Sequence, residues 1–434
     1  MKKKFTFAIV FLAAHGLGLS LSAAVIDQVL VRQQWPWSTD VKIEYRISGL
    51  DGSAPVDIVV TAYNGDVPLD SSKLPESLSG DIHGIAENGV GTILLDPIRA
   101  FGTDKTALAD FNVELSVKDS AENVGEVLYK VVDLNTGAVS DIRRRDFLNG
   151  KCGAYETDFA RIGSGFSTTL GDVLVWTAVT NRTDFLTEKM LFRKIPAKGV
   201  VWQMGETEST SGADSSPAPF WATLDADYYL SVFPVTQAQF AKFRDGYCGE
   251  YFTEAEDHLL YPVADMYLGD VLRSQPASFL SRMKATCGLD INLPTEAQWE
   301  FACRGGTYAK TLYSGSTFGA SAIRALAWCS DNSDGSMQRV GRKPANAYGL
   351  YEMLGNVAEY CLDRGFTYPT GTSREDPVVN PGNAADSGNF VVRGGAYNDS
   401  RLCMRAAYRE FRGGTDVWAR SRRPFGFRVC FPAD

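Results

Sequence analysis

The sequence predicts two domains of different fold class, an all-β sandwich followed by a loop-rich α+β domain. The chain has 434 residues, which is more than one hydrophobic core usually holds. Its first part alternates polar and apolar residues in short runs, whereas its second part carries two short helices within irregular, aromatic and glycine-rich chain. We therefore expect a β-sandwich at residues 25–125, a connector with strands of its own at 126–185, and the α+β domain at 186–434.

The first residues have the order of a targeting segment. Lysines at positions 2–4 precede a short apolar run, and small residues follow at 22–24. This order is typical of a signal peptide, so we expect residues 1–24 to be removed and the protein to be secreted or periplasmic. The alternative is an uncleaved membrane anchor, against which the shortness of the run argues. No later segment is apolar enough to span a bilayer, and we expect no integral membrane protein after cleavage.

Four runs in the predicted sandwich alternate or are rich in β-branched residues. They read VKIEYRI, VDIVVTAY, GTILLD and FNVELSV, and each is bounded by Gly, Pro, Asp or Ser. Short strands that recur with polar turns favour two packed antiparallel sheets. The region contains no catalytic pattern, so we interpret it as a module that packs or binds.

Charge and cysteine content exclude several classes of function. The formal net charge is −9, which argues against a nucleic-acid partner because such binders need a basic face. All eight cysteines follow residue 24, and an even number in an exported protein predicts disulfides whose pairing stays open. There is no CxxC motif and there are only three histidines, which argues against zinc, histidine-bound iron and histidine-dependent nucleophilic catalysis.

Two helices in the second domain have strong start signals. Thr236 and Gln239 form one capping-box pattern, and Thr295 and Gln298 form another. In the second helix Trp299 is expected on the buried face, and the following Gly-Gly pair ends the helix.

Six segments of the second domain occur in the order that is seen in the formylglycine-generating enzyme family. They read MLFRKIPAKGVVWQMG, YYLSVFPVTQAQF, LPTEAQWEFACRGG, NAYGLYEMLGNVAEYCLD, FVVRGGAYNDS and PFGFRVC. The chain therefore resembles these proteins, also called sulfatase-modifying factors, over about residues 186–432. The resemblance implies a loop-rich α+β fold related to C-type lectins.

The resemblance also implies a copper site, and the residues for it differ here. Oxidases of this family bind Cu(I) through two cysteines and use O₂ to convert the cysteine of a CxPxR sulfatase motif to formylglycine. The corresponding positions after the GGAY segment are Asp399 and Met404, which argues against Cu(I). Cys403 is the one nearby thiol and the only candidate catalytic residue. The competing interpretation is that Cys403 is a structural or disulfide cysteine.

A calcium site is a second implication of the family pattern. GNVAEYC resembles the GNVWEW segment through which relatives bind calcium. Asn356 and Glu359 would supply side-chain oxygens, while Val357 and Cys361 would supply backbone carbonyls, which suits Ca²⁺. The alternative is that Asn356 and Glu359 only hydrogen-bond a tight turn.

These observations predict a binding or accessory module without oxidase activity. We expect a peptide, protein or glycan ligand, and an exported sulfatase is a candidate partner. Its contact surface is expected at Tyr397, Asp399, Arg401, Arg405 and Trp418. The alternative is an O₂-dependent formylglycine-generating oxidoreductase with an altered metal site.

Overall fold

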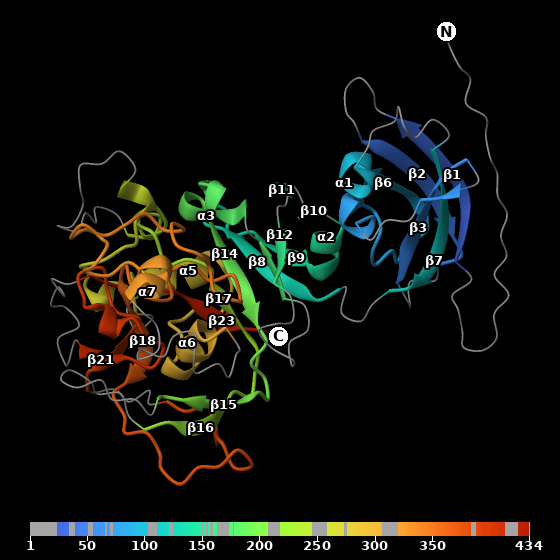
Figure 1. The fold of residues 1–434 in the computed structure, drawn as a ribbon. Coiled ribbons are helices and arrows are strands. Elements are labelled where there is room, and N and C mark those ends of the chain that lie inside the picture. The colour runs from blue at the N-terminus through green and yellow to red at the C-terminus, as the bar shows by residue number, and fades with distance from the viewer. Residues whose placement is uncertain are drawn as a thin grey trace. The chain divides into compact units, whose positions relative to one another are not determined.

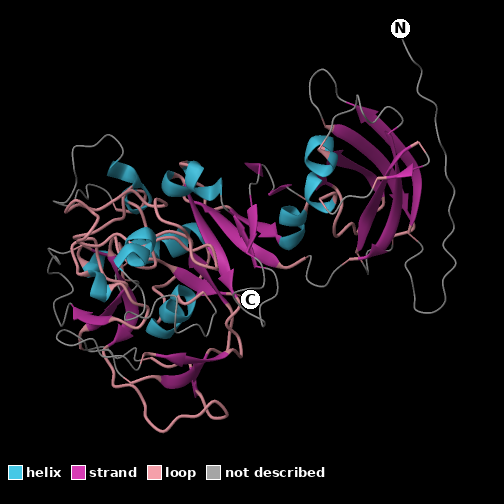
Figure 2. Ribbon diagram, in the orientation of Figure 1, coloured by secondary structure: helices cyan, strands magenta, loops and turns pink. Residues whose placement is uncertain are grey.

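The computed structural model divides the chain into two units. Unit 1 consists of Met1–Val127 and Ile142–Asp158, and unit 2 consists of Leu128–Asp141 and Phe159–Asp434. Figures 1 and 2 show both units. The residues that the structure describes are 24–33, 40–50, 55–65, 67–69, 73–102, 111–120, 125–149, 151–152, 155–156, 159–162, 173–176, 178–206, 218–244, 258–272, 276–305, 320–382, 388–412 and 424–433.

Unit 1 contains the predicted β-sandwich. One sheet has the order β1-β2-β6-β5 and the other has the order β4-β3-β7, and neighbouring strands are antiparallel. The strands are β1 (Val25–Gln33), β2 (Val41–Ser48), β3 (Val56–Asn64), β4 (Val67–Pro68), β5 (Leu78–Gly80), β6 (Gly89–Leu95) and β7 (Phe111–Asp119). The all-β expectation for this region is confirmed.

Period-two alternation builds the core of the sandwich. In β2 the residues Val41, Ile43, Tyr45 and Ile47 are buried while those between them are more exposed. Gly91 lies opposite Tyr45 in the ladder, and a Cβ on that glycine would lie 2.3 Å from the tyrosine ring. Short helices η1 (Pro75–Ser77) and α1 (Pro97–Phe101) complete the unit's regular structure up to β7.

The segment expected to be a connector contributes strands to the main sheet of unit 2. This antiparallel sheet has the order β23-β17-β14-β8-β9. Its strands are β8 (Val127–Asp133), β9 (Val139–Arg143), β14 (Lys189–Ile195), β17 (Tyr228–Ser231) and β23 (Cys430–Pro432). In β8 Leu128, Tyr129, Val131 and Val132 are all buried, so this strand is covered on both faces. The boundary expected near residue 186 is therefore too late for this hairpin.

Short elements follow β9 in the chain. They are α2 (Arg144–Leu148), β10 (Lys151–Cys152), β11 (Tyr155–Glu156), β12 (Phe159–Ile162), β13 (Val173–Trp176), η2 (Ala178–Asn181) and α3 (Asp184–Thr187). β10 pairs with β11, and β12 pairs with β13.

Two smaller sheets and several helices form the rest of unit 2. The sheets have the orders β15-β16-β19 and β21-β20-β18-β22. Their strands are β15 (Val201–Met204), β16 (Phe220–Thr223), β18 (Ala358–Arg364), β19 (Val378–Val379), β20 (Phe390–Arg393), β21 (Arg409–Arg412) and β22 (Phe425–Gly426). The helices are α4 (Gln237–Ala241), η3 (His258–Leu260), η4 (Leu268–Asp270), α5 (Phe279–Cys287), α6 (Glu296–Cys303), α7 (Ala320–Leu326) and η5 (Arg401–Cys403). Loops join these elements over long stretches (Figure 2), and the predicted loop-rich α+β class is confirmed.

Both predicted capping boxes are present. The Thr236 hydroxyl accepts from the Gln239 N–H at 3.2 Å, and the Gln239 side chain accepts from the Thr236 N–H at 3.0 Å. Thr295 and Gln298 make the same exchange at 3.2 and 2.9 Å. Gly305 follows α6 with φ +65°, a conformation that glycine adopts without strain.

The predicted disulfides do not form among the cysteines whose side chains the structure describes. Those residues are Cys287, Cys303, Cys329, Cys361, Cys403 and Cys430, and none of them forms a disulfide. Cys303, Cys361 and Cys430 are buried in the core of unit 2, and burial raises the pKa of Cys303 to about 12. An even number of cysteines cannot predict pairing, because a disulfide also needs two Cβ atoms close together.

Within the described residues, no helix is both long and apolar enough to cross a membrane.

Candidate functional site

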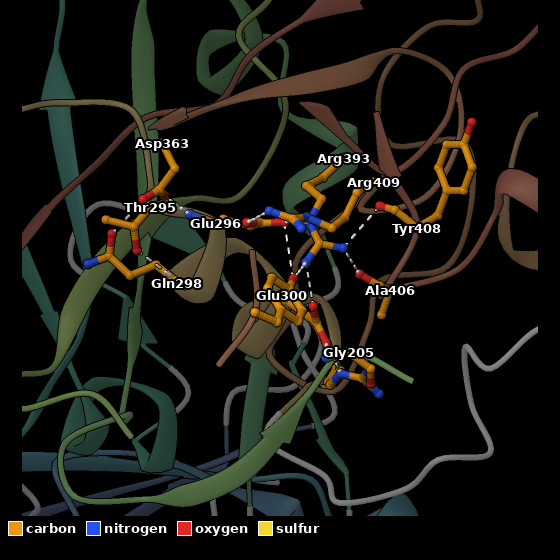
Figure 3. Close-up of polar contacts among 12 residues, drawn as sticks. Gly205, Thr295, Glu296, Gln298, Glu300, Asp363, Arg393, Ala406, Tyr408 and Arg409 are labelled. Carbon is orange, nitrogen blue, oxygen red and sulfur yellow. Dashed lines mark hydrogen bonds and ion pairs between the residues drawn. The ribbon is translucent and has the colours of Figure 1, made fainter. Parts of the chain in front are cut away.

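Arginines of the C-terminal segment lie at the centre of a buried charge network (Figure 3). Arg393 ends β20 and Arg409 begins β21, and the two are paired across the ladder. Arg393 Nε lies 3.0 Å from Glu296 Oε1, and its Nη2 donates to Glu300 Oε2. Arg409 donates to both oxygens of Glu296, at 2.5 and 2.8 Å. Arg393 Nη1 also donates to the carbonyl oxygens of Ala406 and Tyr408, at 2.7 and 3.0 Å.

Helix α6 supplies the carboxylates of this network. Glu296 and Glu300 are one turn apart on the helix, and both are fully buried. Glu300 Oε1 accepts from the Gly205 N–H at 2.8 Å and from Arg304 Nη2 at 2.6 Å. Burial raises the pKa of Glu300, but the charges of Arg304 and Arg393 and the Gly205 hydrogen bond outweigh it and hold this pKa below its ordinary value. The network therefore has the features of a structural support rather than of an acid or base.

Arg428 forms a second buried pair with Glu359. Its Nε donates to Glu359 Oε2 at 2.7 Å, and the indole N–H of Trp299 donates to the same oxygen at 2.7 Å. Arg428 also donates to the carbonyl oxygens of Ser231 and Tyr351, both at 2.9 Å. One guanidinium thus joins β17, β18 and the loop at residue 351.

Two of the side-chain oxygens of the expected calcium site have partners, Asn356 Oδ1 and Glu359 Oε2, whereas Glu359 Oε1 has no hydrogen-bond partner. Asn356 has φ +64°; its Oδ1 accepts from the Gln338 N–H at 3.0 Å and its Nδ2 donates to the Gln338 carbonyl at 2.9 Å. The Glu359 carboxylate faces Arg428, and a cation there would lie beside a guanidinium. Val357 and Cys361, which stand two residues before and two residues after Glu359 in the sequence, are both buried. The contacts of Asn356 agree with the alternative of a hydrogen-bonded turn, and the Arg428 guanidinium beside Glu359 disfavours a cation there. The calcium site itself stays a prediction.

The two positions where family oxidases carry copper ligands have structural contacts here. Asp399 Oδ2 accepts from the Ala396 N–H at 2.9 Å and closes a tight turn. Met404 is buried, and its Cε would lie 2.6 Å from a Cβ on Gly395. Cys403 is half-buried in η5 next to that methionine. If Gly395 carried a Cβ atom, that atom would lie 3.3 Å from the Cβ of Cys403. Among the described side chains, no group of three or more His, Cys, Asp or Glu could hold a metal ion.

The predicted ligand surface is mostly buried. Tyr397 packs in a small apolar cluster with Met337 and Val357. Arg405 is buried and is paired with Glu206.

Only the polar edge of that surface faces solvent. The Arg401 side chain is 46% exposed and lies 3.4 Å from Asp331. Asp399 is half-buried, and Trp418 lies outside the described residues. The structure thus brings Arg401 and Asp399 toward the surface but places Tyr397 and Arg405 inside.

A family model described as a sulfatase-modifying factor enzyme 1-like domain matches residues 192–432, more than half of the chain. The chain belongs to this family. The resemblance expected over residues 186–432 is confirmed, and with it the formylglycine-generating-enzyme fold of unit 2.

Curated relatives match parts of the family domain. A protein named serine/threonine-protein kinase pkn1 of Chlamydia pneumoniae is 28% identical over 193 residues, covering 42% of this chain and 30% of its own length. The formylglycine-generating enzyme of Mycobacterium tuberculosis is 32% identical over 117 residues, covering 24% of this chain and 39% of that enzyme. The enzyme of Streptomyces coelicolor is 32% identical over 153 residues, covering 33% and 47%. This chain spans less than half the length of each of these three relatives.

Solved structures that are similar to part of this chain include two bacterial proteins. Variable protein 1 of Treponema denticola has a TM-score of 0.46 and 22% identity, and covers 56% of this chain and 96% of its own. PvdO from Pseudomonas aeruginosa has a TM-score of 0.44 and 19% identity, and covers 56% and 94%.

Sequence reasoning missed the buried carboxylates of the family domain. Glu296 and Glu300 flank Trp299 in TEAQWEF, and glutamates on a short helix usually face solvent. The available signal was the number of arginines downstream, since buried guanidinium groups need carboxylate partners.

Proposed function

We propose that the family domain is a binding or accessory module that lacks copper oxidase activity. One observation carries this proposal: Asp399 and Met404 stand at the two positions of the copper ligands, and both have structural contacts. Asp399 closes a turn through the Ala396 N–H, and Met404 packs against Gly395. Aspartate is a hard oxygen ligand, whereas Cu(I) prefers soft thiolates.

The surface proposed for a ligand is the exposed turn of residues 398–402. Asn398, Ser400, Arg401 and Leu402 are exposed there, and the Leu402 side chain is 43% exposed. Arg401 and Asp331 add charges of both signs. An exposed apolar residue among polar groups suits a peptide or glycan ligand. Calcium has no part in this proposal.

A mass-spectrometric assay tests the absence of oxidase activity. The purified protein is incubated with Cu(I), O₂ and a CxPxR peptide, with the Streptomyces coelicolor enzyme as a positive control. We expect no mass change of the peptide cysteine to formylglycine. Conversion by this protein that is lost in Cys403→Ala and kept in Cys287→Ala would overturn the proposal in favour of an oxidase with an altered metal site. Cys287 is a suitable control because it is a free, half-buried thiol on α5.

Export is a separate part of the proposal. Its support is the lysine-rich start, the apolar run and the small residues at 22–24. Expression of the full chain in a Gram-negative host should give a periplasmic protein whose N-terminus lies near residue 25. Recovery of the intact N-terminus in the cytoplasm or the membrane fraction would contradict it.

A further inference from the structure

Arg193 is a buried arginine that lacks the partner its charge requires. Its side chain projects from β14, and the residue is 5% exposed. Its Nε and Nη1 atoms are buried and have no hydrogen-bond partner. Within the described part of the chain it makes no ion pair, and the contact that it does make is with the Tyr129 ring, whose centroid lies 4.8 Å from Cζ.

The other buried arginines of the described residues all contact a carboxylate. Arg393 and Arg409 contact Glu296, Arg428 contacts Glu359, and Arg405 contacts Glu206. This comparison makes Arg193 the exception in its own domain. A guanidinium keeps its proton at any ordinary pH, so it cannot avoid the cost of burial by becoming neutral.

Tyr348 presents a second unsatisfied donor in the same core. The residue is 1% exposed, and its hydroxyl has no hydrogen-bond partner. Burial raises the pKa of this phenol well above its ordinary value, so the hydroxyl keeps its proton. The positive charge of Arg193 opposes that rise in the Tyr348 pKa.

The sheet geometry directs Arg193 into the core that contains Tyr348. Arg193 lies opposite Leu230 and Tyr129 in the two flanking strands, and opposite residues share a face of the sheet. Ile195 is two residues further along β14 and is therefore on the same face. Leu230, Ile195 and Tyr348 all belong to one hydrophobic core cluster.

None of the acidic side chains that the structure describes forms an ion pair with Arg193. Asp227 also acts on the pKa of Tyr348, but its Oδ2 lies 3.3 Å from Lys194 Nζ and its Oδ1 accepts from the Lys198 N–H at 2.9 Å. A cation–π contact such as that with Tyr129 offsets only part of the cost of desolvating a cation. Because an unpaired buried charge is strongly unfavourable, the ring leaves most of that cost in place.

We propose that the core of unit 2 holds a small monovalent anion of the size of chloride, bound by the Arg193 guanidinium and the Tyr348 hydroxyl. The unsatisfied groups are donors, and the charge is positive, so the ligand must accept hydrogen bonds and be negative. A water molecule would satisfy the donors but would leave the charge. The Phe301 ring stacks beside Tyr348, with the two ring centroids 6.3 Å apart. Because these surroundings are apolar, the proposal commits to a small inorganic anion rather than to an organic acid.

Thermal unfolding of the full-length protein tests this site. Chloride replaces gluconate at constant ionic strength and pH. Tryptophan fluorescence reports mainly on unit 2, because six of the eight tryptophans belong to it, including Trp176, Trp202, Trp299 and Trp328. Binding to the folded state alone should raise the unfolding midpoint by about 3 °C between low and saturating chloride, and bromide should act in the same way.

Variants separate the site from a general salt effect. Arg193→Met removes the charge and keeps an apolar chain, so the midpoint should no longer depend on chloride. Tyr348→Phe should weaken the dependence. The matched control is Arg182→Met, because Arg182 is paired with Asp184 near the surface and its loss should leave the chloride effect intact.

Crystals grown with bromide give the direct observation. We expect an anomalous peak within hydrogen-bond distance of the Arg193 guanidinium. Three results would each overturn the proposal. They are an unfolding midpoint of the wild type that does not change with chloride, a chloride effect in Arg193→Met as large as in the wild type, and no anomalous peak near the Arg193 guanidinium.

Discussion

Glu352 is a single buried carboxylate that holds a loop through three backbone groups. It is 3% exposed, and it accepts from the N–H groups of Gly341, Arg342 and Lys343 at 3.0, 3.1 and 3.4 Å. Burial raises the pKa of Glu352 to about 7, while these hydrogen bonds act in the opposite direction. Because this pKa exceeds the ordinary value of 4.5, the folded state binds the proton more tightly than the unfolded chain does.

The sign of this shift predicts how stability changes with pH. The contribution of Glu352 is fully present below pH 4.5 and is lost as the pH rises toward 7. The free energy of unfolding of unit 2 should therefore fall by up to about 3 kcal/mol between pH 4.5 and 8 through this group. Urea titrations at several pH values measure that slope, and Glu352→Gln should remove it.

Glu188→Gln is the control for that titration. The Glu188 side chain is 48% exposed and its pKa is lowered by hydrogen bonds from Asn135 and Lys242, so it is ionised throughout the same pH range. An equal slope in the wild type and in Glu352→Gln would contradict the assignment.

Glu300 shows the cost of removing one member of a buried charge network. Glu300→Gln keeps the shape of the side chain but leaves Arg393 and Arg304 without this negative charge. Breaking a buried pair in this way should lower the free energy of unfolding by about 3–5 kcal/mol. Asp290→Asn should cost less than about 1 kcal/mol, because the Lys284–Asp290 pair is 43% and 60% exposed. Similar losses in the two variants, measured by urea unfolding, would show that the network adds little to stability.

Among the structural elements, the capped helices were predictable because their signals are local. Thr236, Gln239, Thr295 and Gln298 stand at the correct spacing in the sequence, and each pair forms within one turn of chain. What the spacing could not predict is that both helices are buried on nearly all sides. That burial depends on residues far away in sequence, such as Asp363, whose Oδ2 accepts from the Glu296 N–H at 2.5 Å.

The two caps should differ in strength. The Thr236 hydroxyl accepts from Gln239 and also donates to the Leu186 carbonyl at 2.6 Å, which joins α4 to α3. The Thr295 hydroxyl accepts from the Gln298 N–H at 3.2 Å. Thr295→Ala should cost about 1 kcal/mol, and Thr236→Ala should cost about 1 kcal/mol more because it also leaves a buried carbonyl unsatisfied.

Chemical denaturation of the alanine variants and of Thr236→Ser measures these differences. Thr236→Ser keeps the hydroxyl and should recover most of the loss. A smaller cost at Thr236 than at Thr295 would show that the bond to Leu186 contributes nothing.

For the whole molecule, the order of six segments along the chain predicted the family and its fold, because each segment forms a local part of the family domain. The sequence also showed that Asp399 and Met404 replace the copper ligands, because both positions lie close to the local GGAY segment. The structural contacts of Asp399 and Met404 were not visible, and neither was the pairing of buried glutamates with arginines that lie 93 to 113 residues away in sequence. The absence of disulfides among the described cysteines and the pairing of β8 with β14 also depend on three-dimensional proximity, which a single sequence does not contain.

The β8–β9 hairpin decides where unit 2 begins. Its strand β8 pairs with β14 over five residues, and its turn approaches α5, since a Cβ on Gly137 would lie 2.0 Å from the Thr286 carbonyl oxygen.

We therefore compare a fragment of residues 125–434 with one of residues 144–434, which lacks only this hairpin. The longer fragment should be soluble and should unfold cooperatively, because the sheet is complete. The shorter one exposes the edge of β14 and uncovers Arg193 by removing Tyr129, so it should aggregate or lose cooperativity in size-exclusion chromatography and urea unfolding. A monomeric 144–434 fragment of equal stability would instead place the start of unit 2 after the hairpin, as the composition of the sequence alone suggested.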